Sequence, residues 1–225
     1  MTPRSLAVFL VILAASLVRL ALELRGPFLL ALWPAVSAGT LSIAYSLRTP
    51  ALLGKREDGT HALWAWGVFG PYILFTLAIW RLAKLGSEPA MNEVSPRIWV
   101  GRRLSPTELP ADIEWVVDLT AELPEPSAMR ARKGYRCVPT LDATAPSAAA
   151  LDRIVGELRD TETPILLHCA QGHGRSAAVA AALLIRRGLA PDVDSAERIL
   201  REARPGVRLK PTQRHAIVSW LSRTS

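Results

Sequence analysis

The chain has 225 residues, half of them hydrophobic, and carries a formal net charge of +7 at neutral pH. Two cysteines are too few for a disulfide framework, so the composition excludes the small proteins that depend on one. Residues 1–85 hold eight bases and only three acids beside long apolar segments, and this favours contact with an anionic membrane surface over binding to nucleic acid.

Three apolar segments, at about residues 6–22, 26–47 and 61–80, dominate the first part of the chain. The second has no charged side chain across 22 positions and the third has none across 20, and a bilayer core takes about 20 apolar residues per helix. The first is shorter and contains Arg19. A cleaved signal peptide is its competing interpretation, although no convincing small-residue cleavage site follows it. We predict a transmembrane helical region over residues 1–85, whose bases can simply mark its loops.

Residues 86–89, with the sequence Gly-Ser-Glu-Pro, are typical of a linker. Short apolar segments after it predict strands at residues 97–101, 115–119, 135–139 and 164–167. Apolar or amphipathic patterns predict helices over residues 146–160, 177–187, 194–203 and 211–222, with Ser147 as a cap of the first and Gly188 after the second. Alternating strands and helices with short connections predict an α/β domain around a mainly parallel sheet over residues 86–225.

Nine residues, 168–176, join the fourth predicted strand to an apolar helix, in the order His-Cys-Ala-Gln-Gly-His-Gly-Arg-Ser. Backbone N–H groups in such a strand-to-helix turn have no partner within the helix, and they converge on a point where an anion fits, helped by the helix dipole. Gly172 and Gly174 permit a curled backbone, and the planar guanidinium of Arg175 suits two phosphate oxygens. We expect the same positive field to lower the pKa of Cys169 and to favour its nucleophilic thiolate.

Cys169, five further residues, Arg175 and then Ser176 resemble the signature loop of the cysteine-dependent phosphatases, and are most similar to the dual-specificity branch with its bacterial and lipid-directed members. The resemblance covers about residues 93–223. It implies the cysteine-phosphatase fold, with a central mainly parallel sheet flanked by helices, here preceded by the N-terminal transmembrane helical region. It also implies hydrolysis of phosphate monoesters through a cysteinyl-phosphate intermediate, with no cofactor and no metal.

The resemblance implies a role for each residue of the loop. Cys169 is expected to attack phosphorus, Arg175 to hold the equatorial oxygens, and Ser176 to donate a hydrogen bond to the sulfur as it leaves. Asp142, in the loop after the third predicted strand, matches the acid that protonates the leaving oxygen and then accepts a proton from water. The expected substrate-binding set is Ala170, Gln171, Gly172, His173, Gly174 and Arg175.

Other polar residues near the loop allow more than one interpretation. Asp118 is the runner-up for the proton donor, but it lies in or at the end of a buried strand, where a structural hydrogen bond fits better. Glu122 is interpreted as a solvated charge. His168 braces the loop through hydrogen bonds or packs as a buried histidine, and His173 either tunes substrate choice or lies at the surface. Cys137 is expected to be a buried inert thiol, with a redox partnership to the catalytic thiol as the alternative.

The number of spans decides on which side of the membrane each loop lies. With three spans, residues 48–60 and residues 86–225 lie on opposite faces, whereas with two spans they share a face. Bases flank both sides, so the positive-inside rule does not choose between these arrangements. Because a catalytic thiol requires reducing surroundings, we expect the catalytic part in the cytoplasm, carried by a multi-pass protein of a bacterial inner membrane.

The sequence therefore predicts a membrane-anchored phosphoric monoester hydrolase of the protein-tyrosine and dual-specificity type. Its expected partners are the membrane and a phosphorylated substrate, without nucleic acid. The membrane region favours phospholipid headgroups and the family resemblance favours phosphotyrosine or phosphoserine/threonine proteins, and the sequence does not separate these two classes. A silent module that binds phosphate without turnover and a sulfurtransferase-like protein are the alternatives.

Overall fold

A computed structural model describes residues 2–224, so Met1 and Ser225, at the ends of the two predicted regions, lie outside the described residues. The helices are α1 Pro3–Leu24, α2 Leu32–Leu47, α3 Leu63–Ala83, α4 Ser127–Arg130, α5 Ala148–Leu158, α6 Arg175–Arg186, α7 Val193–Ala203 and α8 Pro211–Thr224. Short 3-10 helices occupy Gly26–Ala31 (η1), Pro50–Leu53 (η2) and Pro106–Glu108 (η3). The strands are β1 Met91–Ser95, β2 Ile98–Arg102, β3 Trp115–Thr120, β4 Gly134–Thr140 and β5 Ile165–Cys169.

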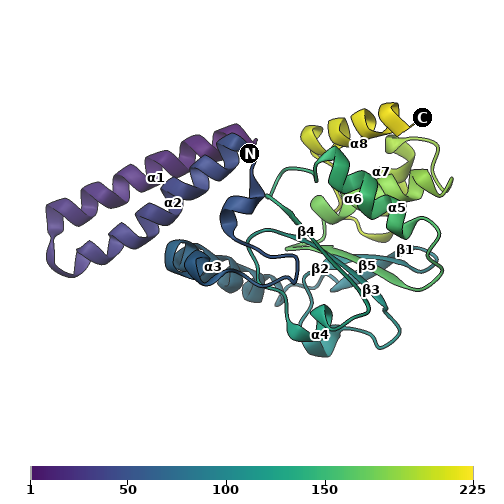
Figure 1. The fold of residues 1–225 in the computed structure, drawn as a ribbon, viewed down its shortest axis with the longest axis horizontal. Coiled ribbons are helices and arrows are strands. Elements are labelled where there is room, and N and C mark those ends of the chain that lie inside the picture. The colour runs from purple at the N-terminus through teal and green to yellow at the C-terminus, as the bar shows by residue number, and fades with distance from the viewer. Residues whose placement is uncertain (1, 225) are drawn as a thin grey trace.

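The strands form one sheet in the order β1-β2-β5-β3-β4, in which β1 is antiparallel and the others are parallel. Helices α5 to α8 lie on one face of the sheet and the short α4 lies on the other (Figure 1). The largest hydrophobic cluster belongs to the first of these faces and includes Leu151 and Val155 of α5 with Ile165 and Leu167 of β5. The prediction of a mainly parallel sheet flanked by helices is confirmed.

Each strand predicted from the sequence is present, and β1 is an addition. The pattern missed β1 because Val94 is its one buried residue, so this edge strand lacks the apolar signal on which the prediction depends. Helix α7 is capped by the side chain of Asp192, which accepts a hydrogen bond from the N–H of Ser195, and it begins at Val193, one residue before the predicted start at Asp194. Ser147 caps α5 as predicted, and Gly188 follows α6 with a left-handed φ of 72°.

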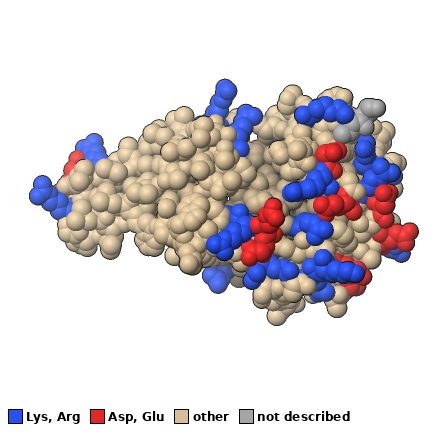
Figure 2. Space-filling view, viewed as in Figure 1, with Lys and Arg blue, Asp and Glu red and all other residues tan. Residues whose placement is uncertain are grey.

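Helices α1 and α2 form a hairpin that projects from the α/β part of the molecule (Figure 1). The chain reverses at Arg25, which has a φ of 52°. The segments Pro3–Leu24, Gly26–Leu47 and Leu63–Ala83 are long and apolar enough to cross a membrane. Figure 2 shows the visible face of the hairpin almost free of Lys, Arg, Asp and Glu, apart from a group at its far end. Large apolar side chains such as Val8 and Ile12 are 60% exposed on it, which is the surface expected of a helix surrounded by lipid.

Helix α3 is tied to the α/β part of the molecule at both of its ends. Before the helix, His61 Nε2 lies 3.0 Å from the carbonyl oxygen of Ala121, just beyond β3. At its end, Trp80 Nε1 donates a hydrogen bond to the carbonyl oxygen of Arg103 at 2.8 Å. The loop between α2 and α3 therefore packs against the sheet.

Lys55, from that loop, is buried in the interface with the sheet. Its ammonium pairs with Asp118 and donates to the carbonyl and hydroxyl oxygens of Thr120 at 2.8 and 2.7 Å. Burial alone would raise the pKa of Asp118, but the neighbouring ammonium lowers it to about 2. Removing one partner of such a buried pair typically costs about 3–5 kcal/mol, so this contact fastens the N-terminal helices to the α/β part.

Candidate active site

The nine-residue loop has the predicted strand-to-helix form. Strand β5 ends at Cys169 and α6 begins at Arg175, with residues 170–174 curled between them. The backbone N–H of Gly172 donates a hydrogen bond to Cys169 Sγ at 3.2 Å. The curled backbone thus directs a donor at the sulfur, which is the arrangement that stabilises a negative charge there.

The two glycines of the loop serve different steric needs. Gly172 has a φ of 78°, and a Cβ at this position would lie 2.4 Å from the carbonyl carbon of Gly101, so a side chain does not fit. Gly174 has a negative φ of −128°. Its missing side chain instead leaves room for the amide of Gln213, which would lie 2.9 Å from a Cβ.

Cys169 is 3% exposed, and its Sγ lies 3.5 Å from Ser176 Oγ. Burial opposes ionisation of the thiol, but the charge of Arg175 and the hydrogen bonds from Ser176 and Gly172 outweigh it and lower the pKa of Cys169 below its usual value. The nucleophilic thiolate is therefore favoured in this loop. Burial instead raises the pKa of Cys137 to about 12, as expected of an inert thiol.

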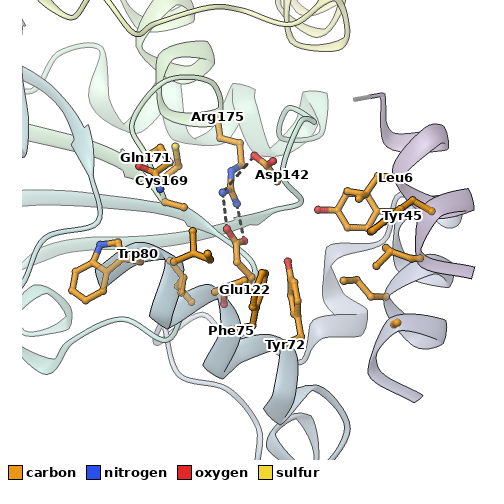
Figure 3. Close-up of a pocket in the computed structure, with 18 of the residues that line it drawn as sticks. Leu6, Tyr45, Tyr72, Phe75, Trp80, Glu122, Asp142, Cys169, Gln171 and Arg175 are labelled. Carbon is orange, nitrogen blue, oxygen red and sulfur yellow. Dashed lines mark hydrogen bonds and ion pairs between the residues drawn. The ribbon is translucent and has the colours of Figure 1, made fainter. Parts of the chain in front are cut away.

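Arg175 is held by a carboxylate that the sequence analysis did not identify. Its terminal nitrogens Nη1 and Nη2 donate to the two oxygens of Glu122 at 2.8 and 2.6 Å, and Nη1 also donates to the carbonyl oxygen of Thr140 at 2.8 Å (Figure 3). Glu122 is 5% exposed, so its interpretation as a solvated charge is wrong. The available signal was its position just beyond β3, which pairs with β5 in the sheet.

The third nitrogen of this guanidinium, Nε, makes none of these contacts. Within the described chain, Arg175 Nε is buried without a hydrogen-bond partner. A buried donor without a partner is unfavourable, and an anion bound in the loop would satisfy it. The Glu122 pair thus orients the fork and leaves the Nε–H and the second N–H of Nη2 for a ligand.

Asp142 lies beside Arg175 at the rim of the site. Its Oδ1 is 3.7 Å from Arg175 Nη2, and its side chain is 62% exposed. It follows β4 in the predicted loop, and the next residue, Ala143, has a left-handed φ of 62°. The hydroxyl of Thr212, at the start of α8, donates to the carbonyl oxygen of Ala143 at 2.8 Å and holds the loop in place. An exposed carboxyl at this rim can exchange protons with solvent.

A second cluster of ionisable groups lies behind the loop. Asp118, Glu125 and His168 are buried, and one side-chain ligand atom from each lies within 4.8 Å of the others. Both oxygens of Asp118 are already engaged, Oδ2 by the ammonium of Lys55 and Oδ1 by the N–H and hydroxyl of Thr120. Burial lowers the pKa of His168 to about 4, so its ring is neutral, and neither ring nitrogen has a hydrogen-bond partner among residues 2–224. This favours the packed buried histidine over the predicted hydrogen-bonded brace.

The middle of the loop is fastened by Arg204, another residue that the sequence analysis missed. Arg204 is 1% exposed and donates to the carbonyl oxygens of Gln171 and Gly172 at 3.0 and 3.1 Å. His173 Nε2 lies 2.8 Å from a carboxylate oxygen of Glu88, which also pairs with Arg204. His173 is thus engaged in bracing the loop and is not a free surface histidine.

A cavity of about 890 Å³ opens over the loop. Its inner end is lined by Asp142 and by the loop residues Cys169, Ala170, Gln171, His173, Gly174 and Arg175. Much of the remaining wall comes from apolar side chains of α1, α2 and α3 (Figure 3), and Arg208, Lys210 and Gln213 also line the cavity. The other predicted site residues, Gly172 and Ser176, do not line the cavity but contact the sulfur of Cys169. Asp118 is not part of the lining, so its place as runner-up acid has no support from geometry.

Comparisons with known proteins bear on this geometry. The family model described as PTP-SAK, Swiss Army Knife protein, DSP-PTPase phosphatase domain, matches residues 103–218, which is more than half of the chain. No curated protein matches the sequence. The matched residues include the whole strand-to-helix loop and Asp142.

Solved structures of phosphatases share the fold. Tk-PTP in its active form is 28% identical with a TM-score of 0.52, and the match covers 60% of this chain and 98% of that one. A variant of human DUSP28 is 24% identical with a TM-score of 0.53, over 61% and 99% of the two chains. PTPMT1 in complex with PI(5)P is 18% identical with a TM-score of 0.52, over 61% and 100%, and at this identity the likeness concerns the fold alone. By its family match and its loop, the chain belongs to the DSP-PTPase family of cysteine-based dual-specificity phosphatases.

Proposed function

We propose that this protein is a membrane-anchored phosphatase that hydrolyses phosphate monoesters through a cysteinyl-phosphate intermediate. The observation that carries the proposal is the sulfur of Cys169, whose pKa is lowered inside a loop that also presents the Gly172 N–H and the Arg175 guanidinium. Nucleophile and anion clamp thus occupy one site, which is what phosphoryl transfer to a side chain requires.

In the proposed first step, the Cys169 thiolate attacks phosphorus in line, the S–P bond forms and the bond to the alcohol oxygen breaks. Arg175 and the loop N–H groups hold the equatorial oxygens, and Asp142 gives its proton to the leaving oxygen. In the second step, water attacks phosphorus, the Asp142 carboxylate accepts a proton from it, and the S–P bond breaks. The hydroxyl of Ser176, 3.5 Å from the sulfur, donates a hydrogen bond to the departing thiolate.

Two observations favour this proposal over the alternatives. Family membership supports a phosphatase and not a sulfurtransferase-like protein. The position of Asp142, 3.7 Å from Arg175 at the rim of the cavity, supports turnover over phosphate binding alone, because binding needs no proton donor.

Asp142→Ala tests the proton donor. With phenyl phosphate, whose leaving oxygen needs a proton, we expect kcat to fall about 10²–10³-fold, because a positioned acid contributes about this much. With p-nitrophenyl phosphate, whose leaving group departs as an anion, the loss should be much smaller. Initial rates of the two substrates give the comparison, and Asp112→Ala, which removes an exposed carboxyl far from the loop, is the control. Equal losses on both substrates would assign the acid to another residue.

We propose that residues 1–85 form the membrane region and residues 86–225 the catalytic part, with α1 and α2 as spans and α3 at the membrane surface. The contacts of His61, just before α3, and of Trp80, in its last turn, support this arrangement. A helix whose two ends both meet the same water-soluble unit does not pass through the bilayer. Its exposed apolar side chains, such as Leu74 and Leu82, fit immersion in the interface.

The distribution of bases supports a cytoplasmic catalytic part. With two spans, the far side of the membrane holds the turn of the hairpin, with Arg19, Glu23 and Arg25. The near side holds Arg4, Arg48, Lys55, Arg56, Arg81 and Lys84. The side with more bases faces the cytoplasm under the positive-inside rule, and reducing surroundings there keep the thiol of Cys169 active.

Two matched cysteine substitutions test this topology. In intact cells, a membrane-impermeant maleimide should label Glu23→Cys, at the turn of the hairpin, and should not label Glu57→Cys, in the loop before α3. After the cells are opened, both should react, because both side chains are exposed. Both substitutions are made in a Cys169→Ser chain, which lacks the reactive thiol. That chain is the background control, since its remaining cysteine, Cys137, is buried. Labelling of Glu57→Cys alone in intact cells would contradict this topology, because it requires either a third span or a catalytic part outside the cytoplasm.

A further inference from the structure

The cavity over Cys169 is much larger than a phosphate group requires. Its volume of about 890 Å³ is typical of sites that enclose a whole organic ligand and not a single anion. It runs from the catalytic loop into the space between the α1–α2 hairpin and α3, and we call this outer part the groove (Figure 3). A substrate that fills the cavity must carry a long extension behind its phosphate.

The two ends of the cavity differ in chemistry. The loop end is lined by Arg175, Arg208 and Lys210, which suit a dianionic headgroup. The groove is lined largely by hydrocarbon, from the hairpin by Leu10, Leu13 and Leu41 and from α3 by Pro71, Phe75 and Ile79. An anionic head followed by an apolar tail matches both ends, because each part then lies against side chains of its own kind.

The polar side chains of the groove are already engaged within the helices. Ser37 Oγ donates to the carbonyl oxygen of Val68, and Thr76 Oγ1 donates to the carbonyl oxygen of Ile73 at 2.9 Å. A peptide laid in the groove would bury backbone N–H and carbonyl groups with few partners, which is unfavourable. An acyl chain needs no hydrogen bond, so the groove favours a lipid over a phosphopeptide.

Two tyrosines lie where the charged loop end of the cavity meets the apolar groove. Figure 3 shows the hydroxyl groups of Tyr45, from α2, and Tyr72, from α3, pointing toward the space beside the Arg175–Glu122 pair. A phenol has an apolar ring and a polar tip, and so suits the point where a lipid changes from ester oxygens to hydrocarbon.

The groove is also open to the surroundings of the helices. Phe9 of α1 is 51% exposed and Phe75 of α3 is 62% exposed, although both line the cavity. If α1 and α2 span the membrane as proposed, this opening faces the bilayer and gives a lipid a lateral path to the loop. We infer, resting on the phosphatase function proposed above, that the substrate is a membrane lipid whose headgroup ends in a phosphate monoester and whose acyl chains lie in the groove.

A substrate series on the full-length protein in detergent micelles tests the inference. The substrates are dioleoyl phosphatidic acid, dihexanoyl phosphatidic acid, a phosphotyrosine peptide and p-nitrophenyl phosphate. We expect kcat/KM for the dioleoyl lipid to exceed that for the dihexanoyl lipid and the peptide by about 10-fold or more, because the longer chains bury more apolar surface in the groove.

Variants on α3 separate the groove from simple enrichment of lipid in micelles. Phe75→Asn should lower kcat/KM for the dioleoyl lipid about 10-fold, through lost apolar contact, and Phe75→Leu should restore most of it. In Phe75→Asn the loss for the dioleoyl lipid should exceed any loss for p-nitrophenyl phosphate, which has no tail, by about fivefold or more, and thermal melting checks the fold. Leu74→Asn is the matched control, since Leu74 is similarly exposed, at 56%, but does not line the cavity.

The outcomes distinguish this inference from the proposed function. Turnover of p-nitrophenyl phosphate with no preference for long chains, or with the peptide as the better substrate, would overturn the lipid assignment and leave the phosphatase standing. Equal losses in Phe75→Asn and Leu74→Asn would also overturn it. No turnover of any substrate by the unsubstituted protein would remove the proposed function and the inference together.

Discussion

Cys169→Ser is expected to reduce turnover of p-nitrophenyl phosphate by about 10⁴-fold or more, as loss of a catalytic nucleophile does. The reason is ionisation: the loop lowers the pKa of the thiol, whereas a serine hydroxyl in the same place stays protonated and attacks phosphorus poorly. Initial rates of the full-length protein in detergent measure the effect. Binding of inorganic phosphate, followed by calorimetry, should persist, because the Gly172 N–H and Arg175 remain.

The chain offers a matched control for this substitution. Cys137→Ser changes the other thiol, which is buried and whose pKa is raised to about 12, and we expect it to keep most of the activity. Iodoacetate should accordingly inactivate the protein by alkylating Cys169 alone, at a pH below that at which an ordinary thiol reacts. A Cys169→Ser protein with activity within 10-fold of the unsubstituted chain would refute the cysteinyl-phosphate mechanism.

Arg175→Lys is expected to lower kcat/KM about 10²–10³-fold although the charge is kept, a loss comparable to removal of one transition-state donor. Two terminal nitrogens of the guanidinium hold Glu122 while Nε stays without a partner among the described residues. A lysine ammonium is a single point and cannot pair with Glu122 and grip a phosphate oxygen in the same fixed geometry. Steady-state kinetics with p-nitrophenyl phosphate measure the loss, and thermal melting checks the fold.

Two further variants show whether the fork geometry is responsible. Arg201→Lys makes the same change on the exposed side of α7, outside the catalytic cavity, and should leave the rate unchanged. Glu122→Gln keeps one hydrogen-bond acceptor for the guanidinium, and its loss should be smaller than that of Arg175→Lys. Near-normal rates in Arg175→Lys would show that charge alone suffices and that the proposed clamp does not exist.

Sequence patterns predicted the catalytic loop well because its structure is local. A buried strand, a turn with Gly172 and an apolar helix adjoin one another in the chain, and their backbone conformations leave N–H groups pointing at Cys169. The position of Asp142 after β4 also follows from the order of the elements. These features need only neighbours in the sequence, and so a single sequence is enough to recognise them.

The charged partners of the site were not predicted, because they come from distant parts of the chain. Glu122 was interpreted as solvated, yet it meets Arg175 53 positions later. Lys55 reaches Asp118 across 63 positions. Neither pairing leaves a local pattern. In the sequence, a charged residue that the fold buries cannot be told from one that stays exposed to water.

The amino-acid sequence by itself determined the phosphatase loop and the apolar segments, because hydrogen bonding within a turn and the hydrophobicity of a helix depend on adjacent residues. Only the tertiary structure decided that the loop before α3 packs on the sheet and that an apolar groove leads from α1, α2 and α3 to the sulfur. The physical reason is that burial is a property of contacts between segments, and these segments meet only when helices and sheet are packed together.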